Sequence, residues 1–370
     1  MRLGVDGWRL HGQLTGVGRY VSNVLRHWTP DVLAGSEVTL YTPAAVDRSV
    51  VELAPTIRER VVPPHWPKLV WENLRLARAA RDDVLFCPSY SAPLAARTRT
   101  VVTIFEATQK LFPELYPWRT RVIYSPVYGW SARHASLVIT SSDAAATDIA
   151  GAYRVARENI RIVPLAPAEI FGPLRDDPRT PEAVRRTLGR TAPYFLYVGK
   201  LTARRNVPML VEAFAELKRR APRPHKLLVV GLNTTGVDLA GRARELGVEA
   251  DFRHIEYVSD DDLSLLYAGA EAFVLPYSYE ALSLTALEAQ AAGCPVLTVD
   301  TPGLREQTGG HALLMAKAGV LELVAAMERL ADDEPLRRKL AERGLAHASR
   351  FTWERCSHAT LDVLAEAGRP

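Results

Sequence analysis

The sequence predicts an α/β protein built from two doubly wound parallel-sheet domains. Its 370 residues exceed what one hydrophobic core usually supports, so two domains of comparable size are expected. Short β-rich apolar runs alternate with helical patterns from end to end, as in parallel sheets covered by helices. The alternation lapses around residues 164–181, where APAEIFGPLRDDPRTP carries the prolines and charges of an inter-domain connection.

The first half of the chain is predicted to form one parallel sheet with its helices. Its strands are expected at Arg2–Asp6, Glu37–Tyr41, Val84–Cys87, Thr100–Ile104, Leu137–Thr140 and Ile160–Val163. Its helices are expected at Val17–Trp28, Leu69–Ala80, Trp118–Arg133 and Ala144–Ala150. We therefore predict an N-terminal domain over residues 1–170 and a linker over 171–185.

The second half restarts the same pattern and predicts a C-terminal domain over residues 186–348. Its strands are expected at Tyr194–Val198, Lys226–Val230, Phe252–Ile255, Ala272–Leu275 and Pro295–Val299. Its helices are expected at 207–220, 237–246, 260–269 and 285–292. Residues 349–370 contain a last helical pattern, which we expect to pack back toward the N-terminal domain. Because doubly wound sheets bind ligands at the carboxyl ends of their strands, the two domains are expected to face across a cleft.

Composition narrows the class of protein. Apolar residues at 48% and charged residues at 24% are typical of a globular protein. The net charge of +4 argues against nucleic-acid binding, which needs a concentrated basic face, but it leaves contact with an anionic membrane open. Cys87, Cys294 and Cys356 are widely spaced and odd in number, so neither a disulfide framework nor a zinc site is predicted.

The expected location is the cytoplasm, with weak peripheral contact to the inner membrane face as a possibility. The N-terminal MRLGVDGWRL has too short an apolar run for a signal peptide, and no segment has the length of a membrane span. The helix Leu69–Ala80 carries Arg75, Arg78 and Arg81 and could lie on a membrane surface. The alternative, an ordinary helix covering the first sheet, is favoured.

The most informative segment is YSYEALSLTALEAQAAGCPVLTV at residues 277–299. It places Glu280 in a loop and Glu288 about one turn into the following helix. Free N–H groups at Ser283-Leu284-Thr285 and the positive end of the helix would face a bound anion. Backbone amides that hold phosphates, flanked by two carboxylates that accept hydrogen bonds from sugar hydroxyls, suit a nucleotide-sugar. Such a ligand has phosphates in its middle and a sugar ring at each end. The alternative is a capping box, Thr285-x-x-Glu288, with Glu280 as a solvated loop residue.

Two further loops are candidates for ligand binding, and each follows the first predicted strand of one half of the chain. In GQLTGVGRY, glycines including Gly16 would let the backbone approach a ligand, although the third glycine of a dinucleotide fingerprint is missing. The alternative is a flexible turn into a helix. GKLTARRN offers the cations Lys200, Arg204 and Arg205 to a diphosphate, and Asn206 is expected to cap the next helix. Its alternative is a solvated basic turn.

No metal site is predicted. The pair Asp260-x-Asp262 could be mistaken for metal ligands, but a run of acids entering a helix is better explained by capping and the helix dipole. The histidines have no ligand spacing, and no nucleophile elbow is present.

Two segments of the chain resemble motifs of bacterial-type family-four retaining glycosyltransferases, also called glycosyl transferases group 1. GKLTARRN resembles their glycine-Arg-Lys loop. Their E-x7-E region is resembled by the segment from YVSDDDL through YSYEALSLTALEAQAAGCPVLTV to GGHALL. The similarity extends to GQLTGVGRY, DVLFCPSYSAPL, TSSDAAATDI, NIRIVPL and RFTW, and so covers nearly the whole chain. It implies the GT-B fold, in which two Rossmann-like domains take the acceptor (here 1–170) and the nucleotide-sugar donor (here 186–348).

The resemblance also implies residue roles. Lys200 and Arg205 would bind the donor diphosphate and stabilise the leaving charge. Glu288 would hold the ribose, and Glu280 would contact the transferred sugar and its developing charge. The amides of Ala281, Leu282, Ser283, Leu284 and Thr285 would hold the distal phosphate and sugar, and Gly16 would close over the diphosphate. No cofactor or metal is expected.

Two departures from the family pattern affect these expectations. EALSLT replaces a glycine-rich EGFGLP, so Ala281 and Ser283 reduce backbone freedom in the sugar pocket. Phe105-Glu106 replaces His-Asp on the acceptor side. An acid/base role there would rest on Glu106, whose alternative is an ordinary loop acid.

The expected function is transfer of a hexose-type sugar from a nucleoside-diphosphate sugar to a hydroxyl acceptor, with retention of the anomeric configuration. The acceptor could be a glycan, a lipid-linked molecule or a secondary metabolite, and no motif specifies the oligomeric state. Two alternatives stay open: a nucleotide-sugar epimerase or hydrolase of the same fold, and a non-catalytic sugar-nucleotide-binding subunit.

Overall fold

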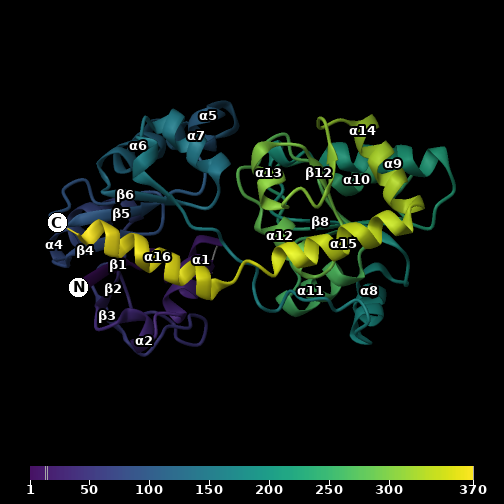
Figure 1. The fold of residues 1–370 in the computed structure, drawn as a ribbon. Helices are drawn as coiled ribbons and strands as arrows, with labels where there is room; N and C mark the ends of the chain where they lie inside the picture. Colours follow the sequence, from purple (N-terminus) through teal and green to yellow (C-terminus); the bar gives the residue numbers. More distant parts are fainter. Residues whose placement is uncertain (13, 15, 370) are drawn as a thin grey trace. The chain divides into compact units, whose positions relative to one another are not determined.

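The computed structural model describes residues 1–12, 14 and 16–369, and these form two α/β units, each with its own sheet (Figure 1). The first unit contains Met1–Leu165 and the C-terminal segment from Thr352 onward, and the second contains Ala166–Phe351. The predicted fold class, two parallel-sheet α/β domains, is confirmed. Gln13 and Thr15 of the GQLTGVGRY loop lie outside the described residues.

The first unit contains a seven-stranded parallel sheet with the order β3-β2-β1-β4-β5-β6-β7. Its strands are β1 (Arg2–Asp6), β2 (Glu37–Thr42), β3 (Ile57–Val61), β4 (Val84–Cys87), β5 (Arg99–Thr103), β6 (Leu137–Thr140) and β7 (Ile160–Ile162). Every predicted strand is present within about a residue or two, as expected for element boundaries. The prediction missed β3 because this edge strand, IRERV, exposes most of its side chains and lacks an apolar run.

The helices of the first unit cover this sheet. They are η1 (Trp8–Leu10), α1 (Gly16–Arg26), α2 (Pro30–Leu33), α3 (Lys68–Trp71), η2 (Glu72–Leu76), α4 (Ala77–Ala79), α5 (Thr108–Leu111), η3 (Pro113–Leu115), η4 (Thr120–Tyr124), α6 (Ser125–His134), α7 (Asp143–Tyr153), η5 (Arg157–Asn159) and α16 (Trp353–Gly368). The helix predicted at Leu69–Ala80 is present, but its middle, η2, is a π-helical turn. It buries Trp71 and Leu76, as a helix covering the sheet would.

The second unit contains a six-stranded parallel sheet with the order β10-β9-β8-β11-β12-β13. Its strands are β8 (Tyr194–Val198), β9 (Lys226–Val230), β10 (Phe252–Ile255), β11 (Ala272–Leu275), β12 (Val296–Val299) and β13 (Leu313–Met315). The short edge strand β13 was not predicted. The central strand β8, YFLYV, is buried throughout, as expected for a strand covered on both faces.

The helices of the second unit are α8 (Arg179–Leu188), η6 (Ala203–Arg205), α9 (Val207–Arg220), α10 (Leu239–Glu245), α11 (Asp260–Gly269), α12 (Leu284–Ala291), α13 (Pro302–Gln307), α14 (Val320–Asp332) and α15 (Glu334–Ala348). After α15 the chain returns to the first unit as α16, drawn in yellow beside α1 (Figure 1). There Ser357 Oγ donates to the carbonyl of Val24 at 2.9 Å, and Arg161 pairs with Glu366.

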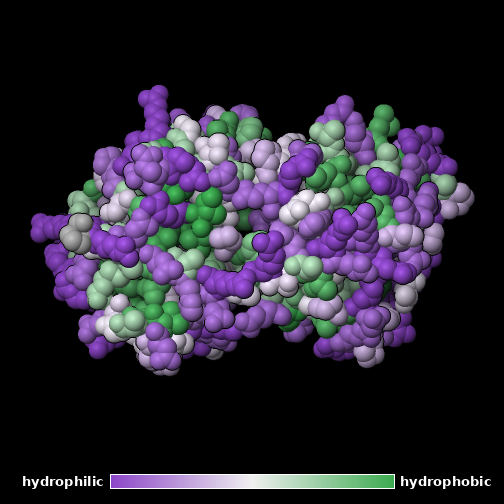
Figure 2. Space-filling model, in the orientation of Figure 1, coloured by the Kyte–Doolittle hydropathy of each residue, from purple (hydrophilic) through white to green (hydrophobic). Residues whose placement is uncertain are grey.

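Polar side chains cover most of the face drawn in Figure 2, with hydrophobic side chains gathered in smaller areas. In the described part of the chain, no helix combines the length and the apolar character needed to cross a bilayer.

Candidate active site

Two loops meet at the carboxyl edge of the second sheet, where the strand order changes direction. The strand β8 lies between β9 and β11, so the loops that follow β8 and β11 flank the topological switch point. GKLTARRN follows β8, and the segment 276–283 follows β11. Asn206 of the first loop donates to Ser278 Oγ of the second at 2.7 Å. The structure therefore brings together two of the loops that the sequence singled out.

The exit from β8 depends on contact between two glycine backbones. Gly199 has φ +141° and Gly231, after β9, has φ +144°. A Cβ on Gly231 would lie 2.1 Å from the carbonyl oxygen of Gly199. The Gly199 amide donates to the carbonyl of Val230 at 2.9 Å and the Leu201 amide to that of Leu232 at 2.9 Å. The GKLTARRN loop thus starts as a fixed extension of the sheet edge.

The loop carboxylate Glu280 is buried. Its side chain is 5% exposed, and its Oε1 lies 3.6 Å from Nη2 of Arg204, whose side chain is 15% exposed. A Cβ on Gly303, at the start of α13, would lie 2.5 Å from the Glu280 carbonyl oxygen, so the loop backbone rests directly on that helix. The alternative of a solvated loop acid is therefore wrong. A paired and largely buried carboxylate is a group whose position the fold specifies.

Arg205 lies in an aromatic setting beside this pair. Its guanidinium carbon is 5.1 Å from the ring centroid of Tyr277, and its Nη1 donates to the carbonyl of Lys200 at 3.0 Å. The Tyr277 hydroxyl donates to that of Tyr197 at 3.4 Å. Burial works to lower the pKa of Arg205, but Tyr277, Tyr197 and Glu280 outweigh it and raise that pKa above its usual value. Arg205 is thus a permanent cation, whereas the Lys200 side chain is exposed to solvent.

The expectation that the side chain of Asn206 caps the next helix is wrong. Its side chain does not cap α9. Instead, its Nδ2 donates to the Pro276 carbonyl at 3.0 Å and to Ser278 Oγ, and its backbone is left-handed with φ +50°. Pro208 stands in the first turn of α9, where the missing N–H of a proline leaves no helical hydrogen bond unmade. The side chain of Asn206 therefore joins the two loops.

The start of α12 is capped by Ser283. The Ser283 hydroxyl accepts from the Ala286 amide at 3.3 Å and lies 3.0 Å from that of Thr285. The capping box expected as an alternative at Thr285-x-x-Glu288 is therefore wrong, because the helix begins two residues earlier than that box requires. Ala281 is buried, and Leu282, Leu284 and Thr285 are half-buried around this helix start.

Glu288 lies one turn into α12, as predicted, and is half-buried. Its Oε2 accepts from the hydroxyl of Tyr267 in α11 at 3.3 Å. Burial, with the charge of Glu288 nearby, raises the pKa of Tyr267 well above its usual value, so this hydroxyl keeps its proton. The carboxylate of Glu288 is thus oriented by a neutral donor.

The two halves of the chain match two family models. Residues 14–166 match Glycosyltransferase Family 4, and residues 181–347 match Glycosyl transferases group 1. The chain is built from the domains of these glycosyltransferases.

Relatives and solved structures agree with this assignment. The O-antigen chain mannosyltransferase B of Escherichia coli is 28% identical over 288 residues, which cover 77% of this chain and 75% of that protein. The D-inositol 3-phosphate glycosyltransferase of Actinosynnema mirum is 31% identical over 245 residues, 63% of this chain and 58% of that protein. The match thus spans less than two thirds of the latter's length.

Two crystal structures show the same fold. Anabaena HepE in complex with UDP-glucose aligns with a TM-score of 0.76 and 16% identity over 99% of this chain and 100% of that chain. WaaG, a glycosyltransferase involved in lipopolysaccharide biosynthesis, aligns with a TM-score of 0.71 and 18% identity over 98% and 99% of the two chains. The expected GT-B fold is therefore confirmed.

The acceptor-side residues expected in this glycosyltransferase lie in the first unit. Phe105 belongs to its core, with its ring 5.1 Å from that of Tyr20 and 6.0 Å from that of Tyr90. Glu106, directly after it, is half-buried. Gly16 is exposed at the first position of α1, and a Cβ there would meet no atom within 4 Å. The fold itself therefore does not require glycine at position 16.

The acidic run at 260–262 lies at a helix start. The Ser259 hydroxyl accepts from the Asp262 amide at 3.1 Å, and the Asp262 carboxylate pairs with Arg186. These contacts support the capping explanation. Among the residues that the structure describes, no cluster of histidine, cysteine or acidic side chains has the arrangement of a metal site.

Sequence reasoning missed several residues of the second-unit site. From the sequence, Arg204 is one of three cations in its loop, and nothing indicates that it pairs with Glu280. That ion pair depends on the turn η6. Tyr197, Tyr267 and Tyr277 were treated as strand, helix and loop residues. Their hydroxyls were a usable signal, since buried tyrosines usually find hydrogen-bond partners.

Proposed function

We propose that the protein transfers a hexose-type sugar from a nucleoside-diphosphate sugar to a hydroxyl acceptor, with retention of the anomeric configuration. The single observation that carries the proposal is the burial of Glu280 beside Arg204 at a switch-point loop that leads into α12. A largely buried carboxylate next to a helix start suits a ligand that has both a sugar and phosphates.

Each residue of the second-unit site has a proposed role in binding the donor. Arg205 and Lys200 neutralise the diphosphate, and the amides of residues 281–285 hold the distal phosphate and sugar. Glu288, oriented by Tyr267, accepts from the ribose hydroxyls. Solved Anabaena HepE carries UDP-glucose and the Escherichia coli relative is named a mannosyltransferase, which supports a hexose donor.

The proposed step breaks the bond between the anomeric carbon and the terminal phosphate oxygen, and the electron pair leaves with the nucleoside diphosphate. The acceptor oxygen then bonds to the anomeric carbon on the same face. The acceptor proton passes to the departing phosphate. Arg205 and the α12 amides stabilise the charge of the leaving group, and Glu280 stabilises the positive charge that develops on the sugar. The proposal needs no metal or other cofactor.

A peripheral membrane contact is also proposed, through residues 108–123. Leu111, Leu115, Trp118, Val122 and Ile123 are all large apolar residues between 39% and 65% exposed. Hydrophobic side chains are visible over α5 at the top of the first unit in Figure 2. Exposed basic residues at 110, 119 and 121 lie among them in the sequence. Apolar side chains mixed with cations suit an anionic bilayer.

Co-sedimentation with vesicles tests this contact. Binding to vesicles with anionic lipid should exceed binding to neutral vesicles, and Trp118→Ala with Val122→Asp should abolish it. Leu321→Asp, a change at an exposed position of the second unit, is the control. Equal binding by both variants would exclude the proposed surface.

The glycosyl transfer is tested with a panel of nucleoside-diphosphate sugars. Release of nucleoside diphosphate is measured with and without glycan, lipid-linked and small-molecule acceptors, and the anomeric configuration of the product is determined. Release that requires an acceptor supports a transferase. Release without any acceptor would indicate a hydrolase, conversion to an epimeric nucleotide-sugar without net release would indicate an epimerase, and tight binding without turnover would indicate a non-catalytic subunit.

A further inference from the structure

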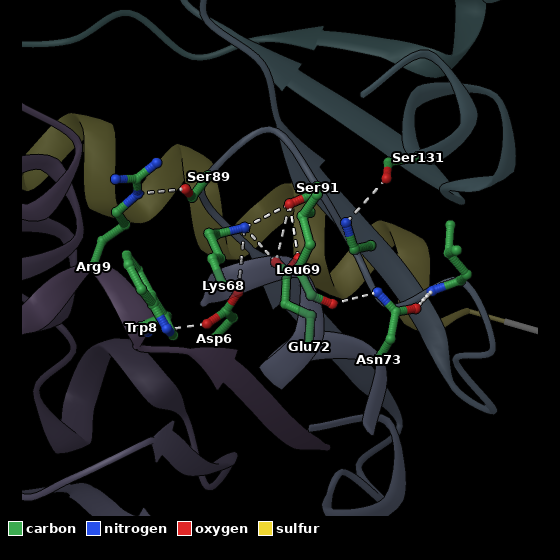
Figure 3. A network of polar contacts seen from close by, with 12 residues as sticks. Asp6, Trp8, Arg9, Lys68, Leu69, Glu72, Asn73, Ser89, Ser91 and Ser131 are labelled. Atoms are coloured by element: carbon green, nitrogen blue, oxygen red, sulfur yellow. Dashed lines mark hydrogen bonds and ion pairs between the residues drawn. The ribbon is translucent and has the colours of Figure 1, made fainter. Parts of the chain in front are cut away.

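A buried group of charged side chains lies at the switch point of the first sheet. Asp6 is the last residue of β1, and Ser91 follows its neighbour β4. Lys68 begins α3 and Glu72 begins the π-helical turn η2. The side chains of Asp6, Lys68 and Glu72 are 1%, 9% and 0% exposed. These residues come from separate elements and converge at one point (Figure 3). We call them, with Ser91, the switch-point cluster.

Lys68 is the centre of this cluster. Its Nζ pairs with Glu72 Oε1, lies 2.5 Å from Ser91 Oγ and lies 3.9 Å from Asp6 Oδ2. The Ser91 hydroxyl is 2.9 Å from Glu72 Oε2. Asp6 Oδ1 accepts the amide of Trp8 at 3.0 Å. The cluster therefore holds both loops, one after β1 through Trp8 and the other after β4 through Ser91.

The charges of the cluster do not balance when both acids are ionised. One ammonium then faces two buried carboxylates, which leaves a net negative charge in a dry environment. Burial, helped by the neighbouring charge of Asp6, raises the pKa of Glu72 to about 7 despite the opposing effect of Lys68. The neighbouring Cys87 and Tyr128 stay neutral, because burial raises the pKa of each.

One buried oxygen indicates where the extra proton is bound. Asp6 Oδ2 has no hydrogen-bond partner among the described residues, although Glu72 lies close enough for the two carboxyls to interact. A protonated Glu72 can donate to this oxygen, and the cluster then becomes neutral. We propose that Asp6 and Glu72 share one proton beside Lys68, and that this pair is a positioning element for the loops that follow β1 and β4.

Infrared difference spectra of the full chain between about pH 6 and about pH 8 test the shared proton, because these values lie on either side of the Glu72 pKa of about 7. The carbonyl stretch of a protonated buried carboxyl should be lost on raising the pH, and Glu72→Gln should abolish this change. Glu366→Gln, at an exposed ion pair of the same unit, should leave it intact. An unchanged titration in Glu72→Gln would overturn the proposal.

A second variant keeps the test informative if Glu72→Gln does not fold. Asp6→Asn removes the like charge and should move the Glu72 titration to lower pH by about one unit or more. An unmoved midpoint would contradict a shared proton. In the wild type the backbone amide signal of Trp8 should shift with the same midpoint in NMR spectra, because Asp6 accepts that amide. A Trp8 signal that is constant between these pH values would exclude the positioning role.

The protein is expected to become less stable to unfolding as the pH rises. The pKa of Glu72 is raised in the folded state, so its contribution to stability is largest below its unfolded pKa and is lost as the pH rises through about 7. The unfolding temperature should therefore fall from about pH 5 to about pH 8, and less steeply in Glu72→Gln. An equal slope in the two proteins would contradict the proposal.

An activity measurement rests on the proposed glycosyl transfer, whereas the spectroscopic ones do not. KM for the acceptor should rise over the same pH interval in the wild type and stay constant in Glu72→Gln, with kcat changing less. A normal infrared titration with no transferase activity would overturn the proposed function alone. An active enzyme without the titration would overturn the shared proton alone.

Discussion

Nη2 of Arg204 lies 3.6 Å from Oε1 of Glu280, and both side chains are largely buried at the start of the loop that leads to α12. The pair joins the loop after β8 to the loop after β11, and so fixes the carboxylate relative to the helix start. In the proposed reaction, Arg204 is a positioning residue and Glu280 contacts the transferred sugar.

Arg204→Ala should lower kcat by about tenfold to a hundredfold with a smaller change in donor KM, because it leaves the largely buried Glu280 carboxylate without the cation that pairs with it. Arg204→Lys should recover part of the loss, and Glu280→Gln should lower kcat at least as much. Steady-state kinetics with a fixed donor measure these effects. Arg186→Ala breaks the more exposed pair with Asp262 and serves as the control. If Arg204→Ala matched this control, the assignment of the pair would be wrong.

Glu288→Ala should weaken binding of the nucleoside diphosphate by about tenfold, as expected for loss of a charged hydrogen-bond acceptor. Tyr267→Phe should have a smaller effect in the same direction, because it removes only the group that donates to Oε2 of Glu288 at 3.3 Å. Titration calorimetry with nucleoside diphosphates measures both. Glu328→Ala, in the surface helix α14, is the matched carboxylate control. Unaltered affinity in Glu288→Ala would exclude this residue from the donor site.

Arg205→Ala should weaken diphosphate binding equally at about pH 6 and about pH 9, because neighbouring Tyr277, Tyr197 and Glu280 raise its pKa and keep it charged across this range. Arg205→Lys should bind more weakly than the wild type, since lysine lacks the planar fork that stacks on Tyr277. Affinity is measured at both pH values. A wild-type affinity in Arg205→Ala would contradict a phosphate contact.

Gly231→Ala should destabilise the second unit by about 1–3 kcal/mol or more, because a Cβ there would lie 2.1 Å from the Gly199 carbonyl oxygen. Gly236→Ala is a matched control, since it also has a positive φ (+74°) but has no atom within 4 Å of the added Cβ. This control measures the cost of placing alanine at a positive φ without a steric contact. Chemical denaturation measures both free energies of unfolding, and equal values would show that the Gly199 contact is not the cause.

Most of the strand order was readable because parallel strands buried on both faces form continuous apolar runs, whereas α8, α13, α14 and α15 of the second unit were not predicted. YFLYV of β8 and LVIT of β6 are such runs, and both are buried throughout. Where most side chains of a strand are exposed, the signal disappears, as in β3. The position of Glu288 one turn into its helix also followed from local spacing alone.

The fold class, the site loops and the family resemblance could be predicted from the amino-acid order. Which residues meet in space depends on the packing of elements that are distant in the chain. Arg204 reaches Glu280 and Asn206 joins Ser278 because β8 and β11 are neighbours at a switch point although they are far apart in the chain. In the first unit, the same geometry gathers Asp6, Lys68 and Glu72. Local periodicity reports which face of an element is buried, but not which side chains from distant elements share that buried space.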